Sequence, residues 1–245
     1  MPFLEHLAEL RRRSLIVIFL FAICTAALYF FVTPVFNFLI APVRGSLEGH
    51  LPITTEVLGA MNVRFGLAAW ASLVLLSPLI IWQSLAFLLP ALKPKERKWV
   101  VPTFIAMVLL FVAGVAFSYR FMLTASFGWL AQQGAGFIRF TPTANDVVTV
   151  VQFLLLIFGL AFQTPVLVFY LVYFRVIPYE VLRKNWRTVY LVIVMLAAFI
   201  PPDWNWVTIA SFAVVLVVLY ETSMLVVRIA LGKRIKREAL EAEGF

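Results

Sequence analysis

The stretch HLAELRRR, residues 6–13, places acidic and basic side chains at helical spacing directly before a long apolar segment. Glu5 and Glu9 are four residues apart, so a helix through this region would carry both carboxylates on one face. Acids near a helix start, and Glu–Arg pairs three or four residues apart, each stabilise a helix by about 0.2–1 kcal/mol. One interpretation of Glu9 is therefore helix electrostatics, through a pair with Arg12 or Arg13.

The other interpretation is a site for a cationic ligand. A carboxylate can accept two parallel hydrogen bonds from a guanidinium group, a geometric match that lysine does not offer. Glu96 is the only carboxylate in the segment LKPKERKW, residues 92–99, and we expect it on the same side of the membrane as Glu9. Two acids in a largely basic surface could take two guanidinium groups, but local charge balance would also explain Glu96.

The composition defines the class of protein that must position these residues. Of 245 residues, 63% are hydrophobic and 13% are charged, whereas a soluble domain carries about 25% charged residues. Inside lipid every backbone polar group must be satisfied within the protein, so a spanning segment is a helix or part of a closed barrel. The apolar runs here are continuous rather than alternating. The sequence predicts an all-α polytopic membrane protein.

The apolar runs predict six transmembrane helices, because about 20 helical residues cross the hydrocarbon layer. Pro78 is expected to kink the second helix. Helices 5 and 6 are short, with runs of about 13–15 residues that rise only ~20–22 Å, and the turn PPDWN separates them. A buried re-entrant hairpin is the alternative for this pair. The predicted spans are residues 14–33, 65–89, 99–126, 147–174, 188–200 and 206–220, the last extending towards 231.

The distribution of lysine and arginine predicts the orientation. Sixteen of the 20 basic residues fall on one side of the six-span arrangement, at the ends of spans, which is the pattern of topology signals rather than of a nucleic-acid surface. The positive-inside rule then places both termini in the cytoplasm and the chain in the cytoplasmic membrane. We expect one domain over residues 1–232, followed by a short, charged and frayed cytoplasmic tail at 233–245, and an interfacial segment at 36–43.

Three further polar residues lie within or beside the predicted spans. Gln163 could contact a partner, or its side chain could be satisfied inside the protein, for instance by the carbonyl that Pro165 frees one turn earlier. Glu221 could pair with Arg228 or face the lipid headgroups, and Asp203 is explained by its turn.

Enzyme chemistry has little support in this sequence. One cysteine and two histidines make a metal centre improbable, so we expect no metal and no cofactor. The nucleotide-binding and hydrolase motifs are absent as well.

The motif HLAELRRR, the segment LSPLIIWQSLAFLLPALKPKERK and the tripeptide PPD together resemble the TatC family. Its members are the signal-peptide receptor subunits of the twin-arginine protein translocase. The resemblance extends over essentially the whole chain and implies six helices arranged like a cupped hand, with both termini cytoplasmic. It also implies export of folded proteins, driven by the proton motive force, together with single-span TatA- and TatB-type partners in an oligomeric translocase.

The same resemblance assigns residues to the twin-arginine site. It implies that Glu9 and Glu96 form this site. Where the family commonly has a glutamate in span 4, this chain has Gln163, which can still contact a partner helix through hydrogen bonds but cannot titrate. Asp203 matches the family's outer-turn acid, whose role stays open. The remaining motif positions, expected to shape the signal-peptide site, are Leu10, Arg11, Gln83 and Phe87.

Two other functions are compatible with a six-span chain. A secondary transporter for a small solute would need several polar residues converging at mid-membrane, and span 4 offers Gln152 and Gln163. A membrane-embedded assembly scaffold would bind a fixed set of proteins and no signal peptide.

Overall fold

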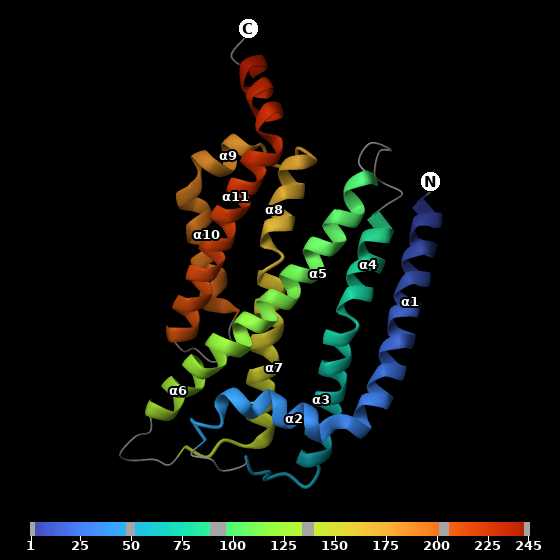
Figure 1. Cartoon of the computed structure of the whole chain (residues 1–245), viewed down its shortest axis with the longest axis vertical. Helices are drawn as coiled ribbons and strands as arrows, with labels where there is room; N and C mark the ends of the chain where they lie inside the picture. The colour runs from blue at the N-terminus through green and yellow to red at the C-terminus, as the bar shows by residue number, and fades with distance from the viewer. Residues whose placement is uncertain (1–2, 48–51, 89–96, 134–139, 201–205, 243–245) are drawn as a thin grey trace. The chain divides into compact units, whose positions relative to one another are not determined.

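The structure is a computed structural model that describes residues 3–47, 52–88, 97–133, 140–200 and 206–242, and these are predominantly helical (Figure 1). The chain divides into two compact units, residues 1–109 with 127–153 and residues 110–126 with 154–245, and each is treated by itself below. In chain order the α-helices are α1 (Phe3–Leu28), α2 (Val32–Ile40), α3 (Gly59–Leu75), α4 (Ser77–Leu88), α5 (Val100–Phe117), α6 (Leu123–Gln133), α7 (Ala144–Ala161), α8 (Thr164–Tyr173), α9 (Tyr179–Lys184), α10 (Trp186–Phe199) and α11 (Trp206–Ala242).

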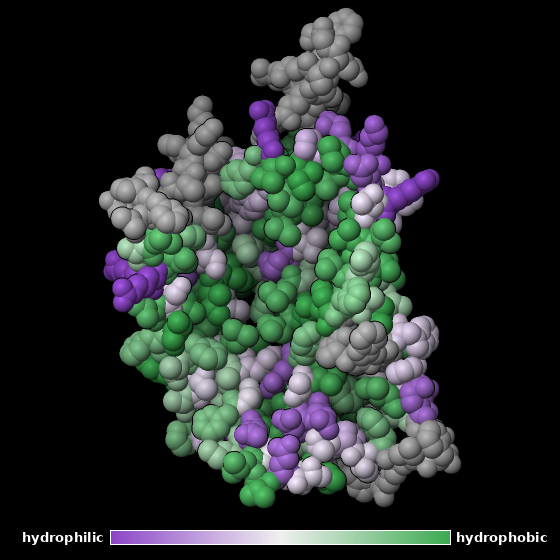
Figure 2. Space-filling model, turned by 180° about the vertical axis from the view of Figure 1, so that it is seen from behind, coloured by the Kyte–Doolittle hydropathy of each residue, from purple (hydrophilic) through white to green (hydrophobic). Residues whose placement is uncertain are grey.

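The prediction of an all-α polytopic membrane fold is confirmed. Four helical segments within the described residues are long and apolar enough to cross a membrane, at 7–43, 100–133, 144–173 and 206–232, and the bent pair α3–α4 is a candidate for a fifth. The apolar helix α10 has 14 residues, as expected for a short fifth span. Hydrophobic residues cover much of the visible surface (Figure 2), as a lipid-facing surface requires.

In the first unit, α1 packs along α3 and α4. Thr25 donates a hydrogen bond of 3.2 Å to Ser72, which joins α1 to α3 within this apolar packing. The predicted kink at Pro78 is confirmed, because α3 and α4 are separate helices that meet at 54°. Proline lacks the backbone N–H that would continue the α3 ladder, and Ser77 Oγ donates to the Val74 carbonyl at the break.

The helix α1 ends at Leu28, inside the first predicted span of residues 14–33. A single 3₁₀ turn, Tyr29–Phe31, leads into α2, and Pro34 lies in the first turn of α2, where a missing N–H costs nothing. α2 runs across the foot of α1 instead of continuing its direction (Figure 1). The segment at 36–43, expected at the membrane interface, falls within α2 and the short 3₁₀ turn that follows it.

A capping interaction begins α7 in the same unit. The Thr143 hydroxyl accepts a bond of 3.2 Å from the Asp146 N–H and donates one of 2.6 Å to the Asp146 carboxylate. This arrangement is a capping box with Asp at its third position. Ala144 N–H donates to the Ile53 carbonyl at 2.7 Å, so the segment before α3 is held at the start of α7.

In the second unit, two glycines allow α5 and α7 to approach closely. A Cβ at Gly114 would lie 2.5 Å from the Phe158 carbonyl oxygen, and one at Gly159 would lie 2.8 Å from the Phe111 ring. The buried rings of Phe158 and Phe212 then meet edge to face, with centroids 5.1 Å apart. Aromatic rings therefore form the core of this unit, beside the place where the backbones of α5 and α7 approach each other.

The second unit also contains the packing of α11 against α8 and α10. A buried hydrogen bond of 2.6 Å joins Ser126 to Thr208 at the start of α11. The helix α11 has 37 residues and is longer than the run expected from residue 206 to 220, or towards 231. The tail predicted to be frayed from residue 233 is helical up to Ala242. The residues after Gly232 are mostly Lys, Arg, Glu, Ala and Leu, all strong helix formers, so nothing stops the helix there.

Candidate functional site

The amino-terminal motif meets α4 through one guanidinium group. Arg13 Nε and Nη2 donate to Glu9 Oε1 at 3.0 and 2.6 Å, and Arg13 Nη1 donates to Gln83 Oε1 at 2.9 Å. Glu9 and Arg13 are one helical turn apart on α1, which explains their pairing. Gln83 comes from α4, so acceptors on two helices converge on the same planar group.

This cluster is only partly covered. The side chains of Arg13 and Glu9 are 26% and 24% exposed. Glu9 Oε1 takes both bonds from Arg13, and Oε2 takes no part in these contacts. The site can therefore hold a guanidinium between a carboxylate and an amide oxygen while remaining reachable from solvent.

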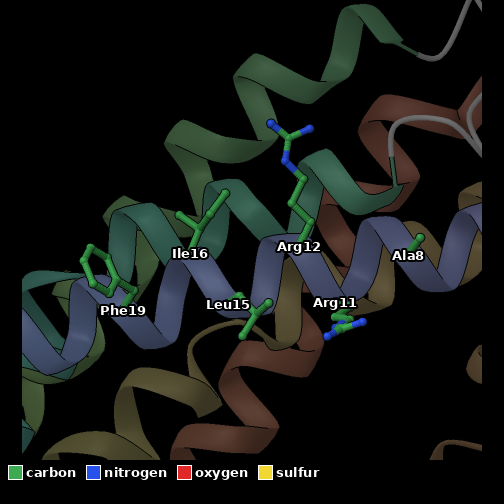
Figure 3. Close-up of a pocket in the computed structure, with 6 residues that line it drawn as sticks. All are labelled: Ala8, Arg11, Arg12, Leu15, Ile16 and Phe19. Atoms are coloured by element: carbon green, nitrogen blue, oxygen red, sulfur yellow. The ribbon is translucent and has the colours of Figure 1, made fainter.

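The structure decides between the two pairs expected for Glu9. Arg13, and not Arg12, is the partner, whereas Arg11 and Arg12 are exposed. Figure 3 shows Arg11 and Arg12 projecting from α1 in different directions. Arg13 is thus the motif arginine that contacts α4, a role that the spacing alone could not single out.

The remaining motif residues have different surroundings. Leu10 is exposed, and Gln83 and Phe87 are half-buried one turn apart on α4. Gln83 and Glu9 are thus linked through Arg13, which donates hydrogen bonds to both. Glu96, the second predicted acid, lies outside the described residues.

A shallow groove of about 800 Å³ follows the exposed face of α1 (Figure 3). Two guanidinium groups flank the end nearer the N-terminus, and the rest of the lining is apolar. A largely apolar groove of this kind could accept an apolar chain. The described residues that line it are Ala8, Arg11, Arg12, Leu15, Ile16 and Phe19.

Gln163 lies at the junction of α7 and α8, at the N-cap position of α8. The helix breaks here because Pro165 follows in the first turn of α8. Satisfaction of the Gln163 side chain by the carbonyl that this break frees was one of two alternatives, beside contact with a partner. The Ala161 carbonyl accepts a hydrogen bond of 2.6 Å from the Thr164 hydroxyl. Gln163 itself is half-buried, and its backbone carbonyl begins α8.

Glu221 on α11 has partners that the sequence did not reveal. Arg183 Nη1 lies 3.2 Å from Glu221 Oε2, and the Tyr190 hydroxyl donates to Glu221 Oε1 at 2.7 Å. Of the two surroundings that the sequence allowed for Glu221, the pair with Arg228 is replaced by these partners, which come from α9 and α10. With Trp186, these residues line a polar cleft of about 510 Å³.

Metal binding finds no support in the part of the chain that the structure describes, which contains no group of three or more His, Cys, Asp or Glu residues able to hold an ion. Asp203, the acid of the predicted outer turn, lies outside the described residues.

Comparison with known proteins identifies the family of the chain. Residues 5–222 match the model of the family described as Sec-independent protein translocase protein (TatC). The Sec-independent protein translocase protein TatC of Deinococcus radiodurans is 31% identical over 232 residues, covering 93% of this chain and 86% of the relative. The protein of the same name from Escherichia coli is 30% identical over 240 residues, covering 97% and 92%.

A solved structure extends this similarity to the fold. The crystal structure of the twin-arginine translocase receptor TatC superimposes with a TM-score of 0.77 at 28% identity, covering 92% of this chain and 99% of that one. The match of sequence and fold over nearly the whole length shows that the chain belongs to the TatC family, the membrane components of the Sec-independent, twin-arginine protein translocase.

Proposed function

We propose that this chain is the receptor subunit of the translocase and binds signal peptides with two consecutive arginines at the cytoplasmic ends of α1 and α4. The observation that carries the proposal is the guanidinium of Arg13, held between Glu9 and Gln83. These acceptors already have the spacing that an arginine side chain requires.

The chemistry of the site favours arginine over lysine. A guanidinium group is planar and presents several N–H donors in a rigid fork, so it can bind a carboxylate and an amide oxygen together. A lysine ammonium is a compact point charge and would gain less from the same pair of acceptors. The second acid, Glu96, is proposed to take the second arginine of the signal peptide, and Leu10, Arg11 and Phe87 to shape the site around them.

The setting of the site supports a cytoplasmic receptor. Lysine and arginine gather at the ends of helices that the positive-inside rule places in the cytoplasm, together with both termini. We therefore place the chain in the cytoplasmic membrane with α1 and α4 opening towards the cytoplasm, where signal peptides are presented. The membrane domain is proposed to span residues 1–232, with residues 233–245 as its charged extension.

Partner proteins complete the proposal. A non-enzymatic receptor needs other subunits to move cargo, and TatA- and TatB-type single-span proteins are the proposed partners, with the proton motive force as the driving force. Gln163 interrupts an apolar helix, and its amide can both donate and accept hydrogen bonds to a polar residue of a partner helix. Because this amide does not titrate, Gln163 is not proposed to carry protons.

A small-solute transporter is the alternative function. The hydrogen bonds of the buried hydroxyl groups argue against it. Ser72, Thr103 and Ser223 each donate to a carbonyl one turn earlier in their own helix. Hydroxyl groups used in this way do not converge on a solute as a mid-membrane binding site would require.

Peptide binding tests the proposal directly. A labelled signal peptide with two arginines, and a matched peptide with two lysines, are titrated into the purified chain in detergent. We expect the arginine peptide to bind at least about tenfold more tightly, and Glu9→Ala or Glu96→Ala to weaken it. Equal affinity for the two peptides, in a chain shown to be folded by circular dichroism, would exclude the receptor function.

A further inference from the structure

We propose that Arg13 is a resident occupant of the arginine site and that one arginine of the signal peptide binds by taking its place. The inference rests on the proposed receptor function and adds a specificity-determining residue to it. Arg13 would then oppose binding, although it lies in the motif that forms the site.

The geometry shows an occupied site. Three N–H groups of Arg13 are engaged, two with Glu9 Oε1 and one with Gln83 Oε1. A second guanidinium approaching from the cytoplasm finds these two oxygens already used. It could add to Glu9 Oε2 from the open side, but it would then lie beside another full positive charge. Full engagement of the carboxylate and the amide by a peptide arginine requires Arg13 to leave.

The surroundings allow that departure. Arg13 is 26% exposed, and a partly exposed ion pair of this kind contributes little stability. Its long side chain can turn towards solvent, to which the neighbouring Arg11 and Arg12 are already exposed. The approach of a peptide arginine would itself favour release through charge repulsion.

The exchange is favourable because the two arginines use the carboxylate differently. Arg13 directs two N–H groups to a single oxygen, since its backbone lies one turn away on the same helix. A peptide arginine approaching from solvent can bind both oxygens side-on, which is the stronger geometry. The net gain in binding free energy is the contact of the peptide arginine with the Glu9 carboxylate minus the contact of Arg13 that it replaces. This gain is smaller than the free energy of either contact alone.

This difference has a consequence for specificity. A peptide lysine cannot form the forked hydrogen bonds that the guanidinium group of Arg13 makes, so it displaces Arg13 poorly. A single peptide arginine gains only the difference in free energy between its own contact and that of Arg13. A second peptide arginine bound elsewhere must therefore add to the affinity. The resident arginine thereby sets a threshold that two consecutive arginines pass and weaker cationic sequences do not.

The test compares two variants that each remove one positive charge from α1. Arg13→Gln removes the resident group, and Arg12→Gln is the matched control on a side chain that does not contact Glu9. With the labelled two-arginine peptide and the purified full chain, we expect Arg13→Gln to bind about three- to tenfold more tightly than the unmodified chain. Arg12→Gln should change the affinity by less than about twofold.

Two further variants distinguish displacement of Arg13 by a peptide arginine from a general change in peptide affinity. In a Glu9→Gln background, Arg13→Gln should give no gain, because the contested carboxylate is missing. Arg13→Lys keeps the charge and the bulk of the side chain but loses the fork, so its affinity should lie between those of the unmodified chain and Arg13→Gln. The two-lysine peptide should gain more from Arg13→Gln than the two-arginine peptide does.

The outcomes are distinguishable. Weaker binding by both Arg13→Gln and Arg13→Lys would show that Arg13 positions Glu9, and it would overturn the inference while leaving the receptor function intact. Equal gains in Arg13→Gln and Arg12→Gln would assign the effect to net charge and would also overturn it. If the unmodified chain does not prefer the two-arginine peptide, the receptor function fails first, and the exchange fails with it.

Discussion

Arg13 on α1 and Gln83 on α4 are 70 residues apart in the sequence, and their side chains meet at 2.9 Å. This contact joins the charged motif before the first span to the helix that follows the Pro78 break. The position of Gln83 thus depends on the bend between α3 and α4, which sets the direction of α4.

Gln83→Leu should lower the stability of the first unit, because Arg13 loses its only contact with α4 among those described here and an amide acceptor is replaced by an apolar group. A loss of about 1 kcal/mol is expected for one partly exposed charge-assisted hydrogen bond. Thermal unfolding in detergent measures it. Ser84→Ala, at the next position, is the control, since Ser84 donates to the Ile80 carbonyl of its own helix. Equal melting temperatures for the two variants would contradict this role.

Gly114→Ala should destabilise the crossing of α5 and α7. The new Cβ would lie 2.5 Å from the Phe158 carbonyl oxygen, and backbone cannot yield as a flexible side chain can. A cost of about 1–3 kcal/mol is expected from this overpacking.

Gly128→Ala is the matched control for that crossing, because no atom lies within 4 Å of the added Cβ and alanine favours a helix more than glycine does. Its melting temperature should stay the same or rise. A Gly114→Ala variant as stable as Gly128→Ala would show that the helices do not approach so closely.

Arg183→Gln should lower the melting temperature slightly, by the loss of its pair with Glu221. Both side chains are more than a third exposed, so the expected cost is below about 1 kcal/mol. Arg228→Gln removes a charge of the same kind from α11 without touching this pair, and it should have no effect. A larger effect for Arg228→Gln would restore the pairing that the sequence suggested.

Arg175→Gly should be more stable than Arg175→Ala by about 1 kcal/mol, although both variants remove the same side chain. Arg175 has a φ of 59° just after α8, where the Val176 N–H donates to the Leu171 carbonyl and its own N–H donates to the Val172 carbonyl. This is a Schellman motif with a non-glycine residue at its left-handed position. Chemical denaturation of the two variants measures the difference, and equal stability would exclude the strained backbone.

The sequence predicted those features that arise from local chemistry. The Pro78 kink was predictable because proline removes a backbone donor wherever it falls within a helix. The apolar runs and the shortness of α10 followed from hydrophobicity and helical rise. Pairing of Glu9 with a nearby arginine was expected from the helical repeat.

Contacts between distant segments could not be predicted in the same way. Arg183, one partner of Glu221, lies 38 residues away, whereas the sequence could suggest only the nearer Arg228 on the same helix or the lipid headgroups. At the α7–α8 break, the hydroxyl of Thr164 donates a hydrogen bond to the Ala161 carbonyl. The side chain of Thr164 is shorter than that of Gln163, the residue that the sequence drew attention to. The hydrogen-bond partners of these polar side chains depend on which helices pack together. Hydrophobic periodicity does not specify the packing partners of a helix.

The most direct test of the account is a double-mutant cycle between Glu9→Gln in the chain and Arg→Lys in the signal peptide. The account predicts that the unmodified chain prefers the two-arginine peptide by at least about tenfold and that Glu9→Gln removes most of this preference, since the amide no longer offers a charged acceptor to the fork. A preference that survives intact in Glu9→Gln would contradict it, because the arginines would then be recognised somewhere other than at Glu9 and Gln83.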